Sequence, residues 1–466
     1  MDEEKLRLKR DVGLMGAVSL IGGTMIGSGI FMSPQTVLST VGSPGAGLVV
    51  WACCGLLVIL VSLCYAELGT VIRESGGEYV YILRTSGPVV AFMLIFSSVL
   101  FVRPAGVAGT ALGFAQYVVA PFYSDCPPPE VLVKCVAAVA ILLLAAVNCI
   151  NVRLSMSVQV FFMVVKVLSL AVIIMGGVVM LVGGRTEGFE DSFENTHVGI
   201  GPIGLAFYQG LWSYEGWNSL NYITEELKRP EVNLPRAILI AISLVTGLYL
   251  LVNVSYLTVM TPAELTSSSA VAVTWGNKVF GRWGWVMSLA AALSAFGSLN
   301  GTFFSGGRVC FVAAREGHMP DILSMVHVHR LTPSPALIFT AAVSLLVLIP
   351  GDFQSIVNFF SFTAWFFYAV TLSGLIYLKI RKPHLPRPYK VPVLLPVLVL
   401  VAAVFLVLAP IIDDPQMEFL YVALFVFSGA VFYVPFIHYE LRPGVLTKLT
   451  VFLQVFLEVA PGDKHL

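Results

Sequence analysis

Long apolar stretches of about 20 residues recur along the whole chain, separated by short segments rich in charged residues, glycine and proline. A helix of this length and character spans the hydrocarbon core of a bilayer. We predict twelve spans, over residues 12–39, 45–72, 88–121, 130–149, 155–183, 200–225, 236–261, 284–312, 335–350, 355–380, 391–411 and 418–438. The pattern therefore indicates an all-α polytopic membrane protein embedded in the lipid bilayer.

The composition agrees with this prediction. Of the 466 residues, 57% are hydrophobic and 12% are charged, whereas soluble domains carry roughly 25% charged residues. The 27 basic and 27 acidic residues cancel, which argues against a nucleic-acid-binding protein because phosphate binding needs excess positive charge.

The distribution of charge predicts the orientation. Twenty-one of the 27 Lys and Arg residues lie in or beside the connections on one side, including both termini. The other side carries acidic residues between 187 and 194 and at 413–414. The positive-inside rule then places both termini in the cytoplasm. Of the remaining basic residues, Lys166 is the one we place well inside a span, and five lie at or near the outer side: Arg103, Lys134, Arg185, Lys278 and Arg282.

Two predicted spans are interrupted by residues that weaken a helix. The first contains four glycines within Gly22–Gly29, and the sixth contains two glycines and a glutamate within Gly210–Asn218. Unwound backbone in a membrane must line a cavity or be buried in protein. Interruptions in the first and sixth spans are typical of transporters built from two inverted five-helix repeats. We expect an N-terminal segment over 1–11, repeats over 12–183 and 200–380, two further helices over 391–438, and a tail over 439–466.

The interruptions suggest a ligand chemistry. The half-helix that begins after Gly29 presents free N–H groups and a positive dipole end, which suit a carboxylate, while unwound carbonyls suit an ammonium. A site with one group of each kind fits the α-carboxylate and α-ammonium that all α-amino acids share. No GxxxxGK[ST] loop or HExxH motif occurs, and the seven histidines are scattered. We therefore expect secondary transport, with no cofactor, no metal and no enzyme activity; a channel or receptor is the other alternative.

Several motifs resemble one family. Gly23–Phe31 (GTMIGSGIF), Cys64–Thr70 (CYAELGT), Ser75–Tyr79 (SGGEY), Tyr214–Leu227 (YEGWNSLNYITEEL) and Arg315–Pro320 (REGHMP) look like the light subunits of heteromeric amino-acid transporters. These belong to the amino acid–polyamine–organocation superfamily with the LeuT-type fold. The resemblance covers residues 10–460 and is strongest to the branch that exchanges neutral amino acids, cystine and dibasic amino acids, with an aromatic-preferring relative second. It implies sodium-independent exchange.

The resemblance also implies a binding site. The substrate carboxylate would be held by Thr24, Gly27, Ser28 and Gly29. The ammonium would meet the carbonyls of the unwound sixth span at Trp212 and Ser213, and Trp212 falls where the family has an aromatic gate. For Trp212 alone, packing or an interfacial anchor is the alternative reading.

Glu215 and Asn218 extend this site. A carboxylate in mid-membrane is costly and indicates a function. In the family, neutral-selective members have glycine at this position and the neutral-and-dibasic branch has aspartate, so Glu215 is a candidate partner for a cationic substrate side chain. A fixed structural pair or a protonated acid are the alternatives. Asn218 would bond substrate or the local turn, while Asn300 and Asn358 are expected to join helices.

Lys166 lies in an apolar stretch of the fifth span. The resemblance places it where sodium-coupled relatives bind an ion, so its ammonium would substitute for that ion. The alternative is a side chain that snorkels to the interface. A proton-coupled symporter of the same fold remains the second functional hypothesis, with Glu215 as the proton carrier.

Cys126 lies in a polar turn on the predicted outer side, and an exposed odd cysteine there favours an intermolecular disulfide. In the family, the matching cysteine links the light chain to a single-span, glycosylated heavy chain, either rBAT-like or of the other type. Pairing with Cys135 is the alternative. We expect a multi-pass plasma-membrane protein, and the tail over 441–460 as an interfacial or a surface helix.

Overall fold

The computed structural model of the chain describes residues 13–73, 76–123, 126–184, 189–190, 192–330, 332–413, 415–440 and 444–461. Within this part, nine helical segments are long and apolar enough to cross a membrane. They are α3 (Pro44–Val71), the α5–η2 segment (Pro88–Phe122), α7 (Glu130–Ile150), α8 (Val152–Val182), α10 (Pro230–Val259), α13 (Trp285–Arg315), α15 (Phe353–Arg381), α16 (Leu394–Asp413) and α17 with η7 (Met417–His438).

The remaining predicted spans are shorter or broken helices. Helices α1 (Leu14–Met25) and α2 (Gly29–Val41) form one span that bends by 52° at the break. Helix α9 (Ile200–Trp212) stops where the sixth span was predicted to break, and the 3-10 helix η4 (Ser219–Glu226) follows. Helix α14 (Ser334–Leu348) occupies the predicted ninth span. The helical, membrane-spanning fold and both interruptions are confirmed, while the boundaries of the two repeats stay a prediction. Residues 1–12 lie outside the described part.

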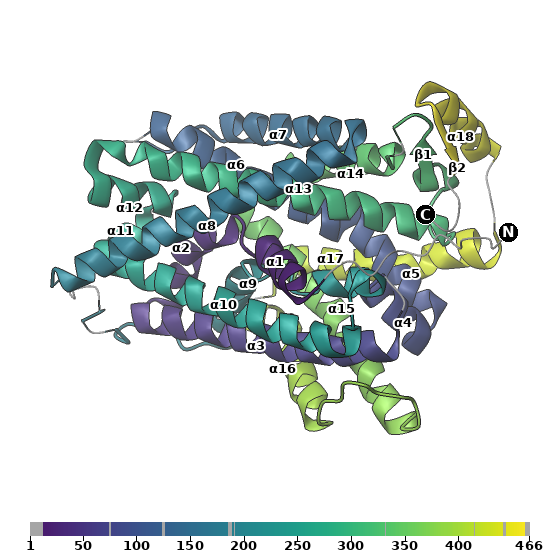
Figure 1. Cartoon of the computed structure of the whole chain (residues 1–466), viewed down its shortest axis with the longest axis horizontal. Helices are drawn as coiled ribbons and strands as arrows, with labels where there is room; N and C mark the ends of the chain where they lie inside the picture. The colour runs from purple at the N-terminus through teal and green to yellow at the C-terminus, as the bar shows by residue number, and fades with distance from the viewer. Residues whose placement is uncertain are drawn as a thin grey trace.

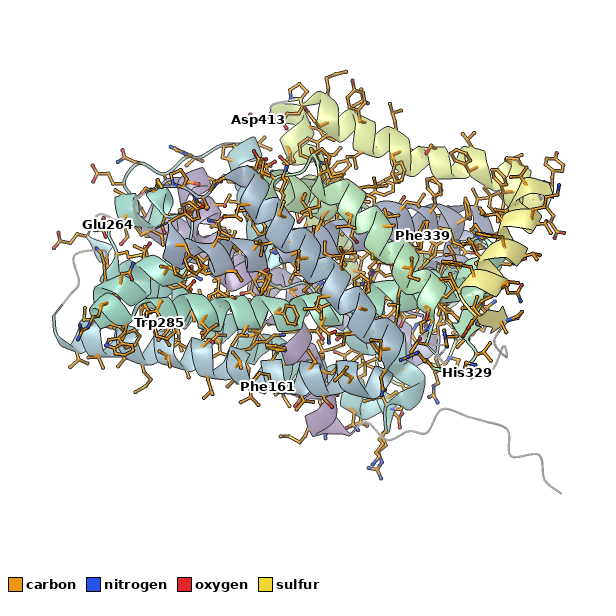
Figure 2. All side chains as sticks on the ribbon, turned by 90° about the horizontal axis from the view of Figure 1, so that it is seen from above. Phe161, Glu264, Trp285, His329, Phe339 and Asp413 are labelled. Atoms are coloured by element: carbon orange, nitrogen blue, oxygen red, sulfur yellow. The ribbon has the colours of Figure 1, made fainter. Side chains whose placement is uncertain are left out.

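The long helices run side by side, and different small elements cover their two ends (Figure 1). Helices α11 (Pro262–Ser267) and α12 (Val271–Phe280) lie at one end, called the α12 end. The other, called the β1 end, carries α4 (Glu78–Ser86), α18 (Gly444–Phe456) and the strands β1 (Met325–His327) and β2 (Val459–Pro461). Figure 2 likewise shows Glu264 and His329 at opposite ends.

The strands β1 and β2 are a departure from the all-α expectation. They pair antiparallel, with Met325 opposite Pro461 and His327 opposite Val459. Three-residue strands carry too few alternating positions to show a pattern in the sequence. Their pairing attaches the C-terminal tail to the connection between α13 and α14, and leaves α18 with exposed apolar side chains at Val445, Phe452 and Val455.

A buried ion cluster joins α3 to the end of α15 and the segment after it. Glu67 Oε1 lies 2.8 Å from Lys379 Nζ and 3.3 Å from Arg387 Nε, and all three side chains are almost fully buried. Lys379 Nζ also donates to the Val391 carbonyl at 2.6 Å. A buried charge is stable only when it is paired and hydrogen-bonded, so this cluster fixes the ends of the two helices relative to each other.

Candidate functional site

A cavity of about 130 Å³ lies where the two interrupted helices meet. A single water needs roughly 10–15 Å³ in the same measure, so the space suits a small organic molecule. Its wall combines both interruptions with α4, α13, α15 and the segment from α5 (Pro88–Ser97) to α6 (Arg103–Val119); the lining residues from the interruptions are Thr24, Met25, Gly27, Ser28, Gly29, Trp212, Glu215, Gly216, Asn218 and Tyr222.

The break between α1 and α2 supplies the backbone donors. Helix α2 begins at Gly29, and Ser28 at its N-cap makes no side-chain cap. The Ser28 carbonyl accepts from the N–H groups of Phe31 and Met32, both at 3.1 Å. The first N–H groups of any helix lack intrahelical partners and lie at the positive end of its dipole. All four residues predicted to hold a carboxylate, namely Thr24, Gly27, Ser28 and Gly29, line the cavity here.

The turn after α9 packs directly on this break. Gly216 has φ +104°, and a Cβ added there would lie 2.5 Å from Thr24 Cγ2, so both its conformation and its contact require glycine. A Cβ on Gly29 would lie 2.6 Å from Ser213 Oγ. Ser213 is buried beneath Gly29 and is not among the lining residues, whereas Trp212, Glu215 and Asn218 are.

A tyrosine in α10 connects the two interruptions. The Tyr249 hydroxyl lies within donor distance of two carbonyls, Met25 at 2.9 Å and Ser213 at 2.6 Å, which share its single hydrogen. Met25 ends α1 and Ser213 follows α9, so one phenol serves the carbonyl ends of both half-helices. Sequence reasoning missed Tyr249, whose only signal was a tyrosine within an apolar span.

Lys166 of α8 supports the same region from another direction. Its Nζ donates to the Gly23 carbonyl at 3.0 Å, and the residue is 1% exposed. The side chain therefore does not snorkel to an interface. It places an ammonium beside the last turn of α1, where carbonyls gather as the helix ends.

Trp212, the last residue of α9, lines the cavity. Its indole contacts Phe360 edge-on at a ring-centroid distance of 5.0 Å and Phe353 at 6.2 Å. It also covers Gly109, where an added Cβ would lie 3.2 Å from the indole. A bulky residue at 109 would thus displace the ring. The indole is therefore packed between α6 and α15 at the cavity wall, and its role as an aromatic gate stays a prediction.

Among the described residues, two carboxylates and one guanidinium line the cavity. Glu215 Oε2 accepts from the Tyr368 hydroxyl at 3.2 Å, and Glu78 Oε1 accepts from Asn218 Nδ2 at 2.8 Å. Glu78 belongs to α4, so the cavity extends toward the β1 end. Sequence reasoning missed Glu78, although it stands in the SGGEY motif.

The position expected for Arg103 is wrong. We placed it near the outer side and took Lys166 as the only cation well inside a span. Arg103 instead begins α6 near the middle of the Pro88–Phe122 span, lines the cavity, and donates from Nη2 to the Tyr222 hydroxyl at 3.0 Å. The π-helix η1 (Ser98–Val102) directly precedes it, and such local widening of a helix is frequent at functional sites.

The other predicted polar residues lie outside the cavity. Asn300 accepts from Asn148 Nδ2 at 3.1 Å and Asn358 accepts from Gln209 Nε2 at 2.9 Å, so each joins two helices as predicted. Cys126 and Cys135 are exposed, and all seven cysteines, each within the described part of the chain, are unpaired.

Discontinuous helices that meet at a cavity, with backbone donors on one wall and charged side chains on another, define a membrane transporter for a small polar substrate. The chain matches the amino acid permease family over residues 12–434 and belongs to it.

Three human relatives refine this assignment. The chain is 49% identical to the b(0,+)-type amino acid transporter 1 of Homo sapiens over 459 residues, 98% of this chain and 94% of the relative. It is 40% identical to the human cystine/glutamate transporter over 468 residues (100% and 93%), and 44% identical to the human large neutral amino acids transporter small subunit 2 over 411 residues (88% and 77%). The resemblance to light subunits of heteromeric amino-acid transporters is confirmed, and the protein is a transporter of amino acids rather than an enzyme.

The bond from Lys166 to Gly23 yields a first prediction. Replacing Lys166 by Met removes a charge-assisted hydrogen bond of about 1.5–3 kcal/mol, so amino-acid uptake should fall about tenfold or more at equal amounts of reconstituted protein. Lys278→Met is the control, because Lys278 pairs with Glu264 in the exposed segment at the α12 end and its loss should leave uptake unchanged. Normal uptake by Lys166→Met would show that this ammonium is dispensable.

Proposed function

We propose that this protein is a sodium-independent exchanger of neutral and cationic L-amino acids and cystine, working by alternating access together with a heavy chain. The observation that carries the proposal is Glu215, a carboxylate in the wall of the cavity directly beside the unwound end of α9. The relatives named as b(0,+)-type, cystine/glutamate and large neutral amino acids transporters support substrates of these classes.

The two interruptions recognise the part that all amino acids share. The α-carboxylate lies against the N–H groups at Gly27, Ser28 and Gly29, where the α2 dipole favours negative charge. The α-ammonium bonds to carbonyls of the unwound segments, with Trp212 closing over it. Since carbonyl oxygens carry two lone pairs, the Met25 and Ser213 carbonyls keep acceptor capacity beside Tyr249.

The charged wall recognises the side chain. Glu215 offers an acceptor for the ammonium or guanidinium of a cationic substrate. Cystine carries a second zwitterion, and Glu215 and Arg103 offer one group of each sign for it. Neutral side chains occupy the same space against Phe360 and Tyr368 without using the charges.

Lys166 supports independence from sodium. A cation that is covalently part of the chain occupies the place beside the end of α1, and its bond to the Gly23 carbonyl provides the support that a bound ion would give. No ion gradient is then needed to complete the site, and one amino acid exchanges for another.

Exchange is directly testable. Proteoliposomes with the light and heavy chains, preloaded with labelled leucine, should release label when external leucine or arginine is added, equally with sodium or choline as the external cation. Release at the same rate without any external amino acid would contradict exchange. Exchange restricted to aromatic or other neutral substrates would narrow the substrate class, and release that requires sodium would exclude the role given to Lys166.

The role of Glu215 predicts a change in selectivity. Glu215→Gln keeps the shape and the acceptor for Tyr368 but removes the charge, so the affinity for arginine should fall about tenfold relative to leucine, since a hydrogen bond to a charged group contributes about 1.5–3 kcal/mol. Competition of both unlabelled substrates against labelled leucine measures the ratio. An unchanged arginine-to-leucine ratio would assign Glu215 to structure.

Cys126 is the attachment point that we propose for the heavy chain. It is exposed and lies between η2 (Ala120–Phe122) and α7. By the positive-inside rule we place both termini in the cytoplasm and Cys126 on the outer side of the plasma membrane. The partner is a single-span glycosylated chain, rBAT-like or of the other type.

Cys126→Ser should therefore abolish the high-mass band of the light chain on non-reducing gels. The exposed Cys135 provides the matched control, because Cys135→Ser should leave that band in place. A band that survives Cys126→Ser and disappears in Cys135→Ser would move the disulfide to α7.

A further inference from the structure

The connection between α15 and α16 carries basic residues and no acidic ones. Residues 379–390 include five Lys and Arg residues, and the sequence has no Asp or Glu between Asp352 and Asp413. The connections before α10 and after α13, which we place on the same side, contain acidic as well as basic residues. Because the positive-inside rule counts only Lys and Arg, the orientation of the chain does not account for the missing acids.

Two of the five cations are used inside the protein. Lys379 and Arg387 pair with Glu67 in the buried ion cluster, and Lys379 also holds the Val391 carbonyl. The Arg387 guanidinium donates from Nη2 to the Lys382 carbonyl at 3.1 Å, and so satisfies a carbonyl at the end of α15. The backbone of the connection is thereby fixed near both of its ends.

The other three cations point outward at the boundary of the apolar surface. Arg381, Lys382 and Lys390 are exposed, and none of them forms an ion pair with a described residue. They lie between Ile380, which is 63% exposed, and Leu394, which is 66% exposed. Both apolar residues belong to membrane-spanning helices, and α16 lies at the margin of the bundle (Figure 1). The three cations therefore lie where the hydrocarbon ends and the lipid head groups begin.

The connection belongs to the β1 end of the molecule. The last third of α15 packs against α4, because a Cβ added to Gly374 would meet Thr85 of α4. The β1 end is the one that we place in the cytoplasm, and the cytoplasmic leaflet of a plasma membrane has a negative surface potential from its anionic phospholipids.

We propose that the connection between α15 and α16 is a binding site for the head groups of anionic phospholipids in the cytoplasmic leaflet, with Arg381, Lys382 and Lys390 as the binding residues. The inference goes beyond the proposed exchange function and depends only on the proposed orientation. Lys and Arg clusters directly cytoplasmic to a spanning helix attract anionic lipids. Here the backbone is fixed before the lipid arrives, so less conformational freedom is lost on binding. Ile380 and Leu394 offer an apolar surface for the acyl chains, which favours a lipid over a soluble phosphate.

The test uses the purified light–heavy complex, immobilised in neutral mixed micelles that contain a trace of radiolabelled phosphatidylserine. The label retained by the complex measures binding, and unlabelled lipids are added as competitors. We expect unlabelled phosphatidylserine to displace the label and phosphatidylcholine with the same acyl chains to leave it bound. Equal competition by the two lipids would overturn the proposal.

Two pairs of lysines provide the matched comparison. Each cation near the surface contributes about fivefold to the attraction for anionic lipid, so the affinity for phosphatidylserine should fall about 25-fold when Lys382→Gln is combined with Lys390→Gln, and about fivefold in Arg381→Gln alone. Lys134→Gln combined with Lys278→Gln removes the same charge, but these lysines are already paired with glutamates, so the affinity should stay unchanged. Equal loss in both pairs, or in neither, would overturn the assignment to this connection.

The soluble head group separates a lipid from a free phosphate. Glycerophosphoserine carries the charges of phosphatidylserine without its acyl chains, so it should not displace the label at equal concentration. Displacement would assign the site to a soluble anion and overturn the lipid. Both lysine pairs should still exchange leucine, because all four lysines lie outside the cavity. A wild-type complex that binds the lipid and does not exchange leucine would overturn the proposed function and not this site.

Discussion

The structure depends on one constraint: a backbone that unwinds inside a membrane must find partners for its polar groups within the protein. Here the helix breaks in two spans meet, and neighbouring helices supply the partners. Lys166 reaches the Gly23 carbonyl from α8, and Tyr249 reaches the Met25 and Ser213 carbonyls from α10. The first N–H groups of α2 lack intrahelical partners, as at the start of any helix, and the residues there line the cavity, where we propose that they bind the substrate carboxylate.

The low dielectric of the membrane interior also constrains the charged wall of the cavity, formed by Glu78, Arg103 and Glu215. Charged side chains there are costly, and each of the three is held by a polar neighbour: Glu78 by Asn218, Arg103 by Tyr222 and Glu215 by Tyr368. These bonds fix the charges before the substrate arrives, so recognition of a side chain requires little rearrangement. In the function that we propose, the backbone binds the zwitterion and the charged wall binds the side chain, which would let one cavity serve several substrates.

Much of this arrangement could be predicted from the sequence, because membrane spans and glycine clusters are local signals. The spans, both interruptions and the lining position of Thr24, Gly27, Ser28 and Gly29 follow from them or from the family resemblance. Arg103 was misplaced, because charge sorting treats a cation as a loop marker even near the centre of an apolar stretch.

Glu78 and Tyr249 were missed for a different reason. Their importance depends on distant segments that they contact: Asn218 is 140 residues away from Glu78, and Met25 is 224 residues away from Tyr249. The pairing of β1 with β2 is equally non-local. No window along the sequence contains such information, whereas a span or a break is visible in one window.

The Tyr249 hydroxyl has a further consequence, because a phenol carries a single hydrogen and two carbonyls compete for it. A separation of α1 from α9 would leave the hydrogen entirely with whichever of the two carbonyls stays in contact with Tyr249. In either case the phenol keeps one hydrogen bond, and the strengthening of that bond offsets part of the loss of the other. The two half-helices are therefore joined by a contact that resists their separation weakly in either direction, which is a mechanical property suited to a hinge that must open both ways.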